Sequence, residues 1–313
     1  MSVLALDIGG TTLKAALVDA EVRSDLRSSA PTRRGDDVVA DAAALLAGLR
    51  DQAPASDPPQ AVGVVTAGTV DGDAGTVRHA ANLGWRDLPL AALLAERLGL
   101  PVGLDHDVRV GAAAELQAGE AQGDMLFVAL GTGVGAGVIT GGRAQAGAAG
   151  AAGELGHMIV RPGGPLCACG QRGCLEALFS AEGLRRRLAE AGRAEVPDLA
   201  VLPHHPDPVS VAIWRDGVQA LALALHNATM LLDPARIVLG GGLSGWGETL
   251  LRPLRADLAA GLAWRSPPEL ALAHHGPEAG LHGAALLARN QLADTPLADV
   301  AHGGTARRPA AKP

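Results

Sequence analysis

The chain has 313 residues, of which 48% are hydrophobic and 19% are charged, and this balance predicts a globular protein long enough for two domains. The formal net charge of −7 disfavours electrostatic attraction to nucleic acids and to anionic membranes. The sequence contains two Phe, four Trp and no Tyr, so no aromatic platform for stacking nucleobases is expected. We therefore expect a small-molecule partner, with no nucleic acid and no membrane.

The N-terminal residues carry no basic segment, and no apolar stretch of about 18 residues is free of glycine and charge. This pattern disfavours secretion and membrane spanning, and it predicts a cytoplasmic protein.

The first part of the chain alternates between short apolar runs and segments with helical spacing, which predicts an α/β domain. Its two opening runs flank a Gly-Gly-Thr-Thr turn and predict a β-hairpin. The predicted strands are 3–6, 15–18, 61–65 and 101–104, and the predicted helices are 38–50 and 88–98.

A second round of the same kind begins at Gly123, so the architecture is expected to repeat. Its predicted strands are 125–130, 135–139 and 236–239, and its predicted helices are 208–232, one after the glycines at 240–242, and 281–292. Residues 296–313 are rich in Gly, Ala, Arg and Pro and have no core pattern, which predicts a disordered tail.

All three cysteines, Cys167, Cys169 and Cys174, fall within eight residues, and the first of them lies ten residues after His157. Zinc prefers four nitrogen or sulfur ligands in a tetrahedron, and this cluster supplies that number. Three thiolates and one imidazole would close the coordination shell, so we expect a structural zinc site and a reaction elsewhere. The alternative is a disulfide or unligated thiols, although a disulfide would leave one cysteine over and a cytosolic compartment opposes it.

Three glycine-rich turns follow predicted strands. They are Asp7-Ile8-Gly9-Gly10-Thr11-Thr12-Leu13-Lys14, Gly131-Thr132-Gly133 and Gly240-Gly241-Gly242. Glycines let the backbone approach an anion, and several N–H groups of such a turn can point at it. One such turn is most often only a hairpin, but three of them indicate phosphate binding. The spacing matches neither a Walker loop nor a Rossmann fingerprint, and it resembles the phosphate-1, phosphate-2 and adenosine loops of the sugar kinase and actin superfamily.

With the cysteine cluster added, the sequence resembles the ROK family of bacterial sugar kinases, whose members include ATP-dependent glucokinases. The resemblance runs from residue 3 to about 292 and includes Gly68-Thr69-Val70-Asp71, Asn82-Leu83-Gly84-Trp85, Glu154-Leu155-Gly156-His157 and the stretch from Cys167 to Glu176. It implies an α/β fold of two ribonuclease-H-like domains of the actin/hexokinase superfamily around a central cleft. The implied division is a small N-terminal domain (1–117 plus 281–295) and a larger C-terminal domain (118–280) with the ATP site and the zinc loop.

The resemblance also implies roles in phosphoryl transfer, which needs a carboxylate near the attacking hydroxyl, a metal and donors around the phosphates. Asp107 is expected to be the base, with Asp105 as the competing candidate. Asp7 is expected to meet Mg²⁺ or its waters. The residues expected to bind ATP are Asp7, Gly9, Gly10, Thr11, Thr12, Lys14, Gly131, Thr132, Gly133, Gly240, Gly241 and Gly242.

A sugar is recognised by hydrogen bonds from paired polar groups in a cleft. The expected ligands are Gly68, Asn82, His106, Asp107, Glu154, His157 and Glu176. Zinc would hold His157 and Glu176 in one rigid unit. The alternative for Glu154 and Glu176 is that they are solvated surface charges.

Two departures from the family are expected to matter. His106 stands where relatives usually carry Asn, which leaves the preferred sugar open, since His106 could instead point away and pack on the following helix. Ala67 replaces the usual Pro before Gly68, which affects loop stiffness.

The leading prediction is phosphorylation of glucose by ATP at the 6-hydroxyl, in a homodimer or homotetramer. Fructose, mannose, N-acetylmannosamine or N-acetylglucosamine could replace glucose, and polyphosphate could replace ATP. A sugar-responsive repressor is disfavoured because six residues precede Asp7 and leave no room for a helix-turn-helix domain. An inactive sugar-binding protein is disfavoured because Asp7, Asp107 and all three turns are present.

Overall fold

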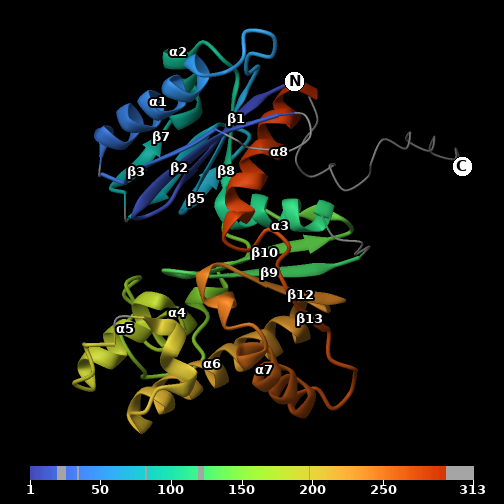
Figure 1. Cartoon of the computed structure of the whole chain (residues 1–313). Coiled ribbons are helices and arrows are strands. Elements are labelled where there is room, and N and C mark those ends of the chain that lie inside the picture. Colours follow the sequence, from blue (N-terminus) through green and yellow to red (C-terminus); the bar gives the residue numbers. More distant parts are fainter. Residues whose placement is uncertain (20–25, 34, 82, 119–122, 197, 294–313) are drawn as a thin grey trace, which may run out of the picture.

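The computed structural model describes residues 1–19, 26–33, 35–81, 83–118, 123–196 and 198–293. These residues form two five-stranded sheets, with helices on their outer faces and two helices between them (Figure 1). The predicted tail, 296–313, and the predicted sugar ligand Asn82 lie outside the described residues.

The first sheet has the strand order β3-β2-β1-β4-β8, in which β1 is antiparallel to β2 and parallel to β4. Alternate residues of β1 face opposite sides, so Leu4 and Leu6 meet helices α1 and α2, while Val3 and Ala5 meet α8. The predicted hairpin, strands and helices of this part are confirmed. The bounds are β1 Val3–Ile8, β2 Thr12–Val18, β3 Leu26–Pro31, β4 Val62–Thr66, β8 Val102–His106, α1 Asp36–Asp51, α2 Leu90–Leu98 and α8 Ala279–Ala293.

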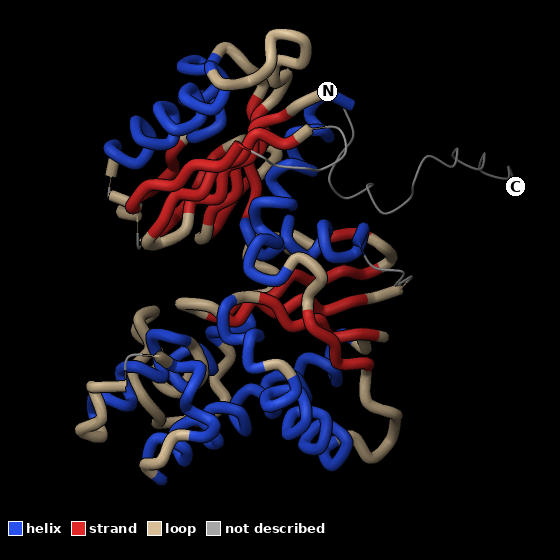
Figure 2. The backbone as a smooth tube through the Cα atoms, in the orientation of Figure 1, coloured by secondary structure: helices blue, strands red, loops and turns tan. Residues whose placement is uncertain are grey.

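The second sheet repeats this topology with the order β11-β10-β9-β12-β13, which confirms the predicted repeat. Helices α4 to α7 cover its outer face, and their leucines form the largest buried cluster with residues of β9, β10 and β12 (Figure 2). The bounds are β9 Met125–Leu130, β10 Val134–Thr140, β11 Arg143–Ala144, β12 Arg236–Gly240, β13 Glu269–Leu272, α4 Leu175–Leu178, α5 Ala181–Glu190, α6 Pro208–Leu232 and α7 Glu248–Gly261.

A third, three-stranded sheet between β4 and α2 was not predicted, because its strands are too short to show a clear alternation. It consists of β5 (Thr69–Asp71), β6 (Thr76–Ala80) and β7 (Trp85–Leu88). Four 3₁₀ helices complete the described elements: η1 Leu155–His157, η2 Leu199–His204, η3 Gly242–Trp246 and η4 Gly276–Glu278. Within the described ranges, no helix has both the length and the apolar character needed to cross a membrane.

Helices α3 (Asp107–Ala118) and α8 pack against each other between the two sheets, with α8 on the first sheet and α3 on the second. Glycines in the strands make this close packing possible. A Cβ on Gly63 of β4 would lie 1.8 Å from the Ala284 carbonyl oxygen, and a Cβ on Gly137 of β10 would lie 2.4 Å from the Ala112 Cβ. Backbone spacing, rather than large side chains, therefore sets the distance between helix and sheet.

We expect Gly63→Ala to lower the free energy of unfolding by about 2 to 3 kcal/mol, because the new methyl group must push α8 away from β4. Gly48→Ala is the matched control. Gly48 is exposed in α1, and no atom lies within 4 Å of the position that a methyl group would take there, so its replacement should raise stability by about 1 kcal/mol. Urea denaturation of both variants tests this, and equal effects would contradict the packing described for α8.

Candidate active site

The first glycine turn lies at the end of β1, where it holds Asp7 opposite Lys14 of β2. The Gly9 N–H donates to the Thr12 carbonyl oxygen at 3.1 Å and closes the turn. Thr32, which follows β3, donates its hydroxyl to the Gly9 carbonyl oxygen at 2.8 Å. The turn is therefore held from both sides.

Asp7 is in an unusual electrostatic environment. Burial is the largest cause that raises the pKa of its carboxyl, the charge of Asp107 adds to it and the charge of Lys14 opposes it, and together they bring the pKa to about 7. A Cβ on Gly280, in the first turn of α8, would lie 3.0 Å from an Asp7 carboxylate oxygen. A divalent cation would stabilise the ionised form of Asp7, which burial and the Asp107 charge disfavour. The carboxylate is therefore suited to be an oxygen ligand of Mg²⁺.

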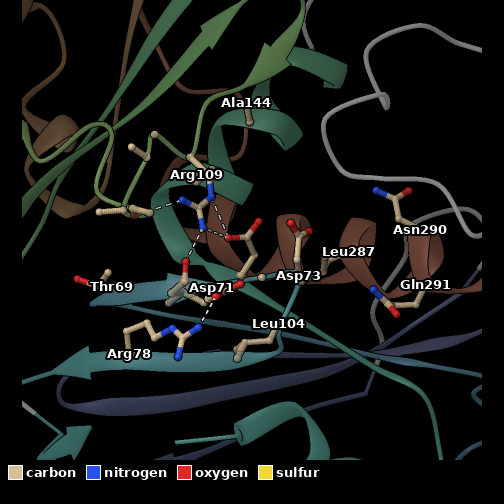
Figure 3. Close-up of a pocket in the computed structure, with 18 residues that line it drawn as sticks. Thr69, Asp71, Asp73, Arg78, Leu104, Arg109, Ala144, Leu287, Asn290 and Gln291 are labelled. Atoms are coloured by element: carbon tan, nitrogen blue, oxygen red, sulfur yellow. Dashed lines mark hydrogen bonds and ion pairs between the residues drawn. The ribbon is translucent and has the colours of Figure 1, made fainter. Parts of the chain in front are cut away.

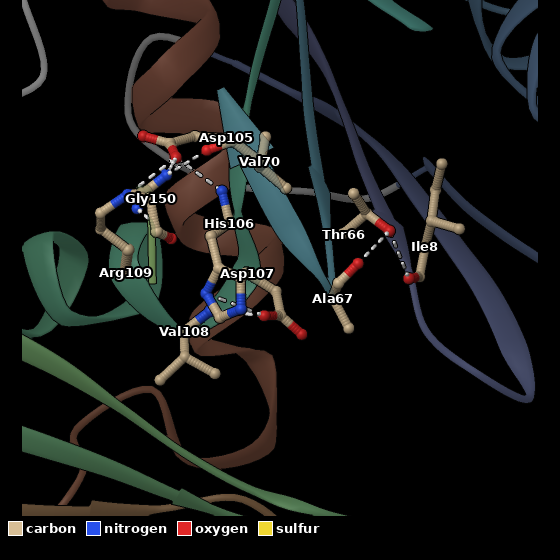
Figure 4. A network of polar contacts seen from close by, with 10 residues as sticks. All are labelled: Ile8, Thr66, Ala67, Val70, Asp105, His106, Asp107, Val108, Arg109 and Gly150. Carbon is tan, nitrogen blue, oxygen red and sulfur yellow. Dashed lines mark hydrogen bonds and ion pairs between the residues drawn. The ribbon is translucent and has the colours of Figure 1, made fainter. Parts of the chain in front are cut away.

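Asp105, near the end of β8, and Asp107, the first residue of α3, differ in their surroundings (Figure 4). Asp105 accepts hydrogen bonds from the His106 N–H at 2.6 Å and from the Arg109 guanidinium, whose Nε lies at 2.8 Å and whose Nη2 also bonds to it. Asp107 accepts from the Val108 N–H at 2.7 Å, and its carboxylate lies 3.4 Å from the His106 Nδ1. The Asp107 side chain is 26% exposed and that of Asp105 13%, so Asp107 is the more accessible carboxylate.

Arg109 was not singled out in the sequence. It is 5% exposed, and besides Asp105 its guanidinium reaches the carbonyl oxygens of Val70 at 3.3 Å and Gly150 at 3.4 Å. It thus joins the first half of the chain to the loop that precedes Glu154. The signal that could have found it is its place in the sequence: an arginine four residues after an aspartate, followed by the small residues Val110 to Ala114.

The second glycine turn lies between β9 and β10 and is close to the third. The Gly131 N–H donates to the Gly133 carbonyl oxygen at 3.0 Å. Gly241 has φ +80°, and a Cβ there would lie 2.5 Å from the Leu130 carbonyl oxygen, directly before the second turn. Val108, next to Asp107, packs on Gly135 of β10, where a Cβ would lie 3.1 Å from its side chain. The start of α3 therefore contacts the strand that follows the second turn.

The segment that carries Glu154 and His157 packs closely on β10. A Cβ on Gly153 would lie 1.8 Å from the Ala136 carbonyl oxygen, and one on Gly156 would lie 2.1 Å from that of Val134. The Glu154 carboxylate lies 3.7 Å from the His157 Nε2. His157 thus has one nitrogen toward Glu154 and the other toward the cysteines.

The cysteine cluster has the spacing of a metal site. The ligand atoms of His157, Cys167, Cys169 and Cys174 all lie within 4.8 Å of one another. The Cys169 and Cys174 sulfurs are 3.7 Å apart, and the Cys167 sulfur lies 3.8 Å from the His157 Nδ1. Tetrahedral zinc with Zn–S near 2.3 Å places two sulfurs about 3.8 Å apart, whereas a disulfide needs about 2.05 Å. The donor set and its spacing therefore fit zinc.

Glu176 follows this cluster and accepts a hydrogen bond from the Val134 N–H at 2.9 Å. Gly68, the remaining predicted sugar ligand, lies in the turn between β4 and β5, where a Cβ would be 2.4 Å from the His79 carbonyl oxygen. The structure thus groups Glu154, His157 and Glu176, and it places Gly68 on the first half.

Two cavities border this region. One of about 800 Å³ lies beside the Asp105–Arg109 pair, between β5, the 144–150 loop and α8 (Figure 3). Among the predicted sugar ligands that the structure describes, none lines it. The other, of about 550 Å³, is lined by Thr12 and Lys14 of the first turn and by Glu278 and Leu281. Open space therefore lies next to the predicted phosphate site.

Two sheets of the same strand order, with a glycine turn between the first two strands of each, define the actin/hexokinase-like fold. Within that class the chain belongs to the ROK family, whose model matches residues 3–291. It is 34% identical to a glucokinase of Streptomyces coelicolor over 310 residues, covering 91% of this chain and 97% of that protein. It is also 34% identical to an N-acetylmannosamine kinase of Citrobacter koseri, covering 92% of this chain and 99% of that protein. A ROK family glucokinase from Streptomyces griseus, solved in complex with glucose and AMPPNP, superposes with a TM-score of 0.81 at 33% identity, covering 93% of this chain and all of that one.

We expect Asp7→Asn to stabilise the metal-free protein in a pH-dependent way. The folded-state pKa near 7 lies above the unfolded value of 3.8, so ionisation of Asp7 destabilises the fold progressively as pH rises between these values. The penalty is complete above pH 7 and amounts to at most about 4 kcal/mol.

Thermal melts in chelator at pH 4.5 and pH 8 should therefore show a gain for Asp7→Asn that is larger at pH 8. Asp257→Asn, at an exposed position of α7, serves as the control and should change little at either pH. A gain of equal size at both pH values would contradict the raised pKa.

Proposed function

We propose that this protein transfers the γ-phosphoryl group of ATP to the 6-hydroxyl of glucose, yielding glucose 6-phosphate and ADP. The observation that carries the proposal is the pair of Asp107 and Asp7, an accessible carboxylate beside a buried one at the start of the first glycine turn. The glucokinase relatives, which match nearly the whole chain, support the choice of sugar and donor.

In the proposed reaction Asp107 accepts the proton of the sugar hydroxyl as its oxygen attacks the γ-phosphorus. Backbone N–H groups of the first and second turns hold the phosphates, and the third turn holds the adenosine. Lys14 adds a positive charge beside Asp7. Mg²⁺, when bound, would neutralise phosphate charge, and Asp7 is the residue that would hold it or its waters.

We further propose that Glu154, His157 and Glu176 contact the sugar hydroxyls from the second half of the chain, and that His106 and Gly68 contact them from the first sheet. Asn82 is proposed as a further sugar ligand. His157, Cys167, Cys169 and Cys174 would hold a structural zinc, which keeps the His157 ring in one orientation. The protein is proposed to act in the cytoplasm, as a homodimer or homotetramer.

N-acetylmannosamine is the second candidate sugar, because the kinase of Citrobacter koseri matches this chain as closely in identity as the glucokinase of Streptomyces coelicolor. His106, which stands in place of the usual Asn, lies next to the proposed base, and its side chain would determine which of the two sugars is preferred.

Asp107→Asn should lower kcat by about two to four orders of magnitude and leave thermal stability and sugar binding close to those of the parent, because it removes the proton acceptor. Asp105→Asn should instead lower stability by about 3 kcal/mol, because it leaves the buried Arg109 charge without its partner. A coupled ADP assay, glucose calorimetry and thermal melts separate the two. Near-normal turnover of Asp107→Asn would assign the base to another residue.

His106→Asn should change the ratio of kcat/KM for N-acetylmannosamine and glucose by about five- to tenfold, because an amide reaches sugar hydroxyls differently from an imidazole. His204→Asn, at an exposed position in the second half, is the control. The measurement is ADP release with a panel of hexoses and N-acetylhexosamines. An unchanged ratio would mean that His106 has no part in recognition.

A further inference from the structure

We infer that Glu176 is a positioning residue for the nucleotide: its carboxylate fixes the second glycine turn to the cysteine loop. The inference rests on the proposed function, since it concerns the turn that would hold the ATP phosphates. Glu176 would then have two roles, the proposed contact with the sugar and the positioning of the turn that holds ATP.

The first observation is the contact between Glu176 and the turn. One carboxylate oxygen accepts from the Val134 N–H at 2.9 Å, directly after Gly133. A Cβ on Gly133 would lie 2.4 Å from that oxygen, so the carboxylate fills the space that a side chain there would take. A hydrogen bond from a backbone N–H to a charged carboxylate is among the stronger ones in proteins.

The second observation is that the chain after Glu176 also holds the turn. The Ala181 N–H donates to the Gly131 carbonyl oxygen at 2.9 Å, and the Glu182 N–H donates to that of Thr132 at 3.4 Å. The same short segment therefore holds the turn at Gly131, at Thr132 and, through Glu176, at Val134. A shift of α4 must move the turn with it.

The third observation is that the same segment starts in the cysteine cluster. Glu176 lies two residues after Cys174, and its second carboxylate oxygen is 3.9 Å from the Cys167 sulfur. The Leu175 N–H donates to the Met158 carbonyl oxygen at 2.9 Å, next to His157. Helix α4 thus links the cysteine cluster to the second glycine turn. The conformation of the cysteine loop therefore affects nucleotide binding as well as the proposed sugar binding.

The test is the binding of AMPPNP with Mg²⁺, without sugar, to the full chain by calorimetry. Glu176→Ala should raise the dissociation constant about tenfold, and Glu176→Gln, which keeps an acceptor for the Val134 N–H, should restore most of the affinity. Glu190→Gln removes an equal charge from an exposed side chain at the other end of α5 and should leave the constant unchanged. Elemental analysis should find equal zinc in the parent and all three variants.

Hydrogen exchange of the Val134 amide provides a readout that does not depend on nucleotide. It should become at least about tenfold faster in Glu176→Ala than in the parent and stay slow in Glu190→Gln. If Glu176→Ala does not fold, Gly133→Ala is the second variant, because its methyl group expels the carboxylate from the turn and should weaken AMPPNP binding in the same way.

Two results separate the inference from the proposed function. If Glu176→Ala weakens only glucose binding, with AMPPNP affinity and Val134 exchange unchanged, the inference is overturned and the kinase proposal stands. If the parent binds no AMPPNP, the kinase proposal fails, and so does the nucleotide role of Glu176, whatever the exchange of Val134 shows about the contact.

Discussion

The contact between α3 and α8 is the constraint on which the rest of the structure depends. Each helix is packed closely on one sheet, and their mutual contact fixes how the sheets face each other. Asp107 begins α3, and Gly280 in the first turn of α8 lies against Asp7, so both carboxylates are placed by helix N-termini. Because alanine and glycine dominate these contacts, little rotamer freedom is lost when the helices pack.

Near this junction, polar groups determine geometry more than stability. A buried ion pair such as that of Asp105 and Arg109 recovers in attraction roughly what its two charges lose on leaving water. The pair mainly fixes positions, since Arg109 also donates to the carbonyl oxygens of Val70 and Gly150. The pair fixes the end of β8, and therefore the direction in which Asp107 leaves it.

The sequence predicted the features that depend on local pattern. Strands and helices with long apolar runs, the three glycine turns and the cluster of one histidine and three cysteines were all identified, because each is encoded by residues close together in the chain. The edge strands β3, β11 and β13, the short strands β5 to β7 and the helices α4 and α5 were not, because their stability comes from tertiary packing rather than from periodicity.

Long-range partners were the other part that could not be predicted. Glu176 was interpreted as a sugar ligand from its place after the cysteines, and that role stays a prediction. Its hydrogen bond to Val134 joins residues 42 positions apart, and no spacing in the sequence encodes such a contact. The same holds for Arg109, whose carbonyl partners lie 39 and 41 residues away.

The environment of Asp7 also affects how the protein exchanges protons with solvent. With a pKa of about 7, this carboxyl is close to half protonated in neutral solution. A cation that pairs with it must pair with the ionised form, so binding expels a fraction of a proton into the buffer. The apparent affinity for that cation therefore rises with pH across neutrality, and the heat of binding includes the ionisation heat of whichever buffer takes up the proton.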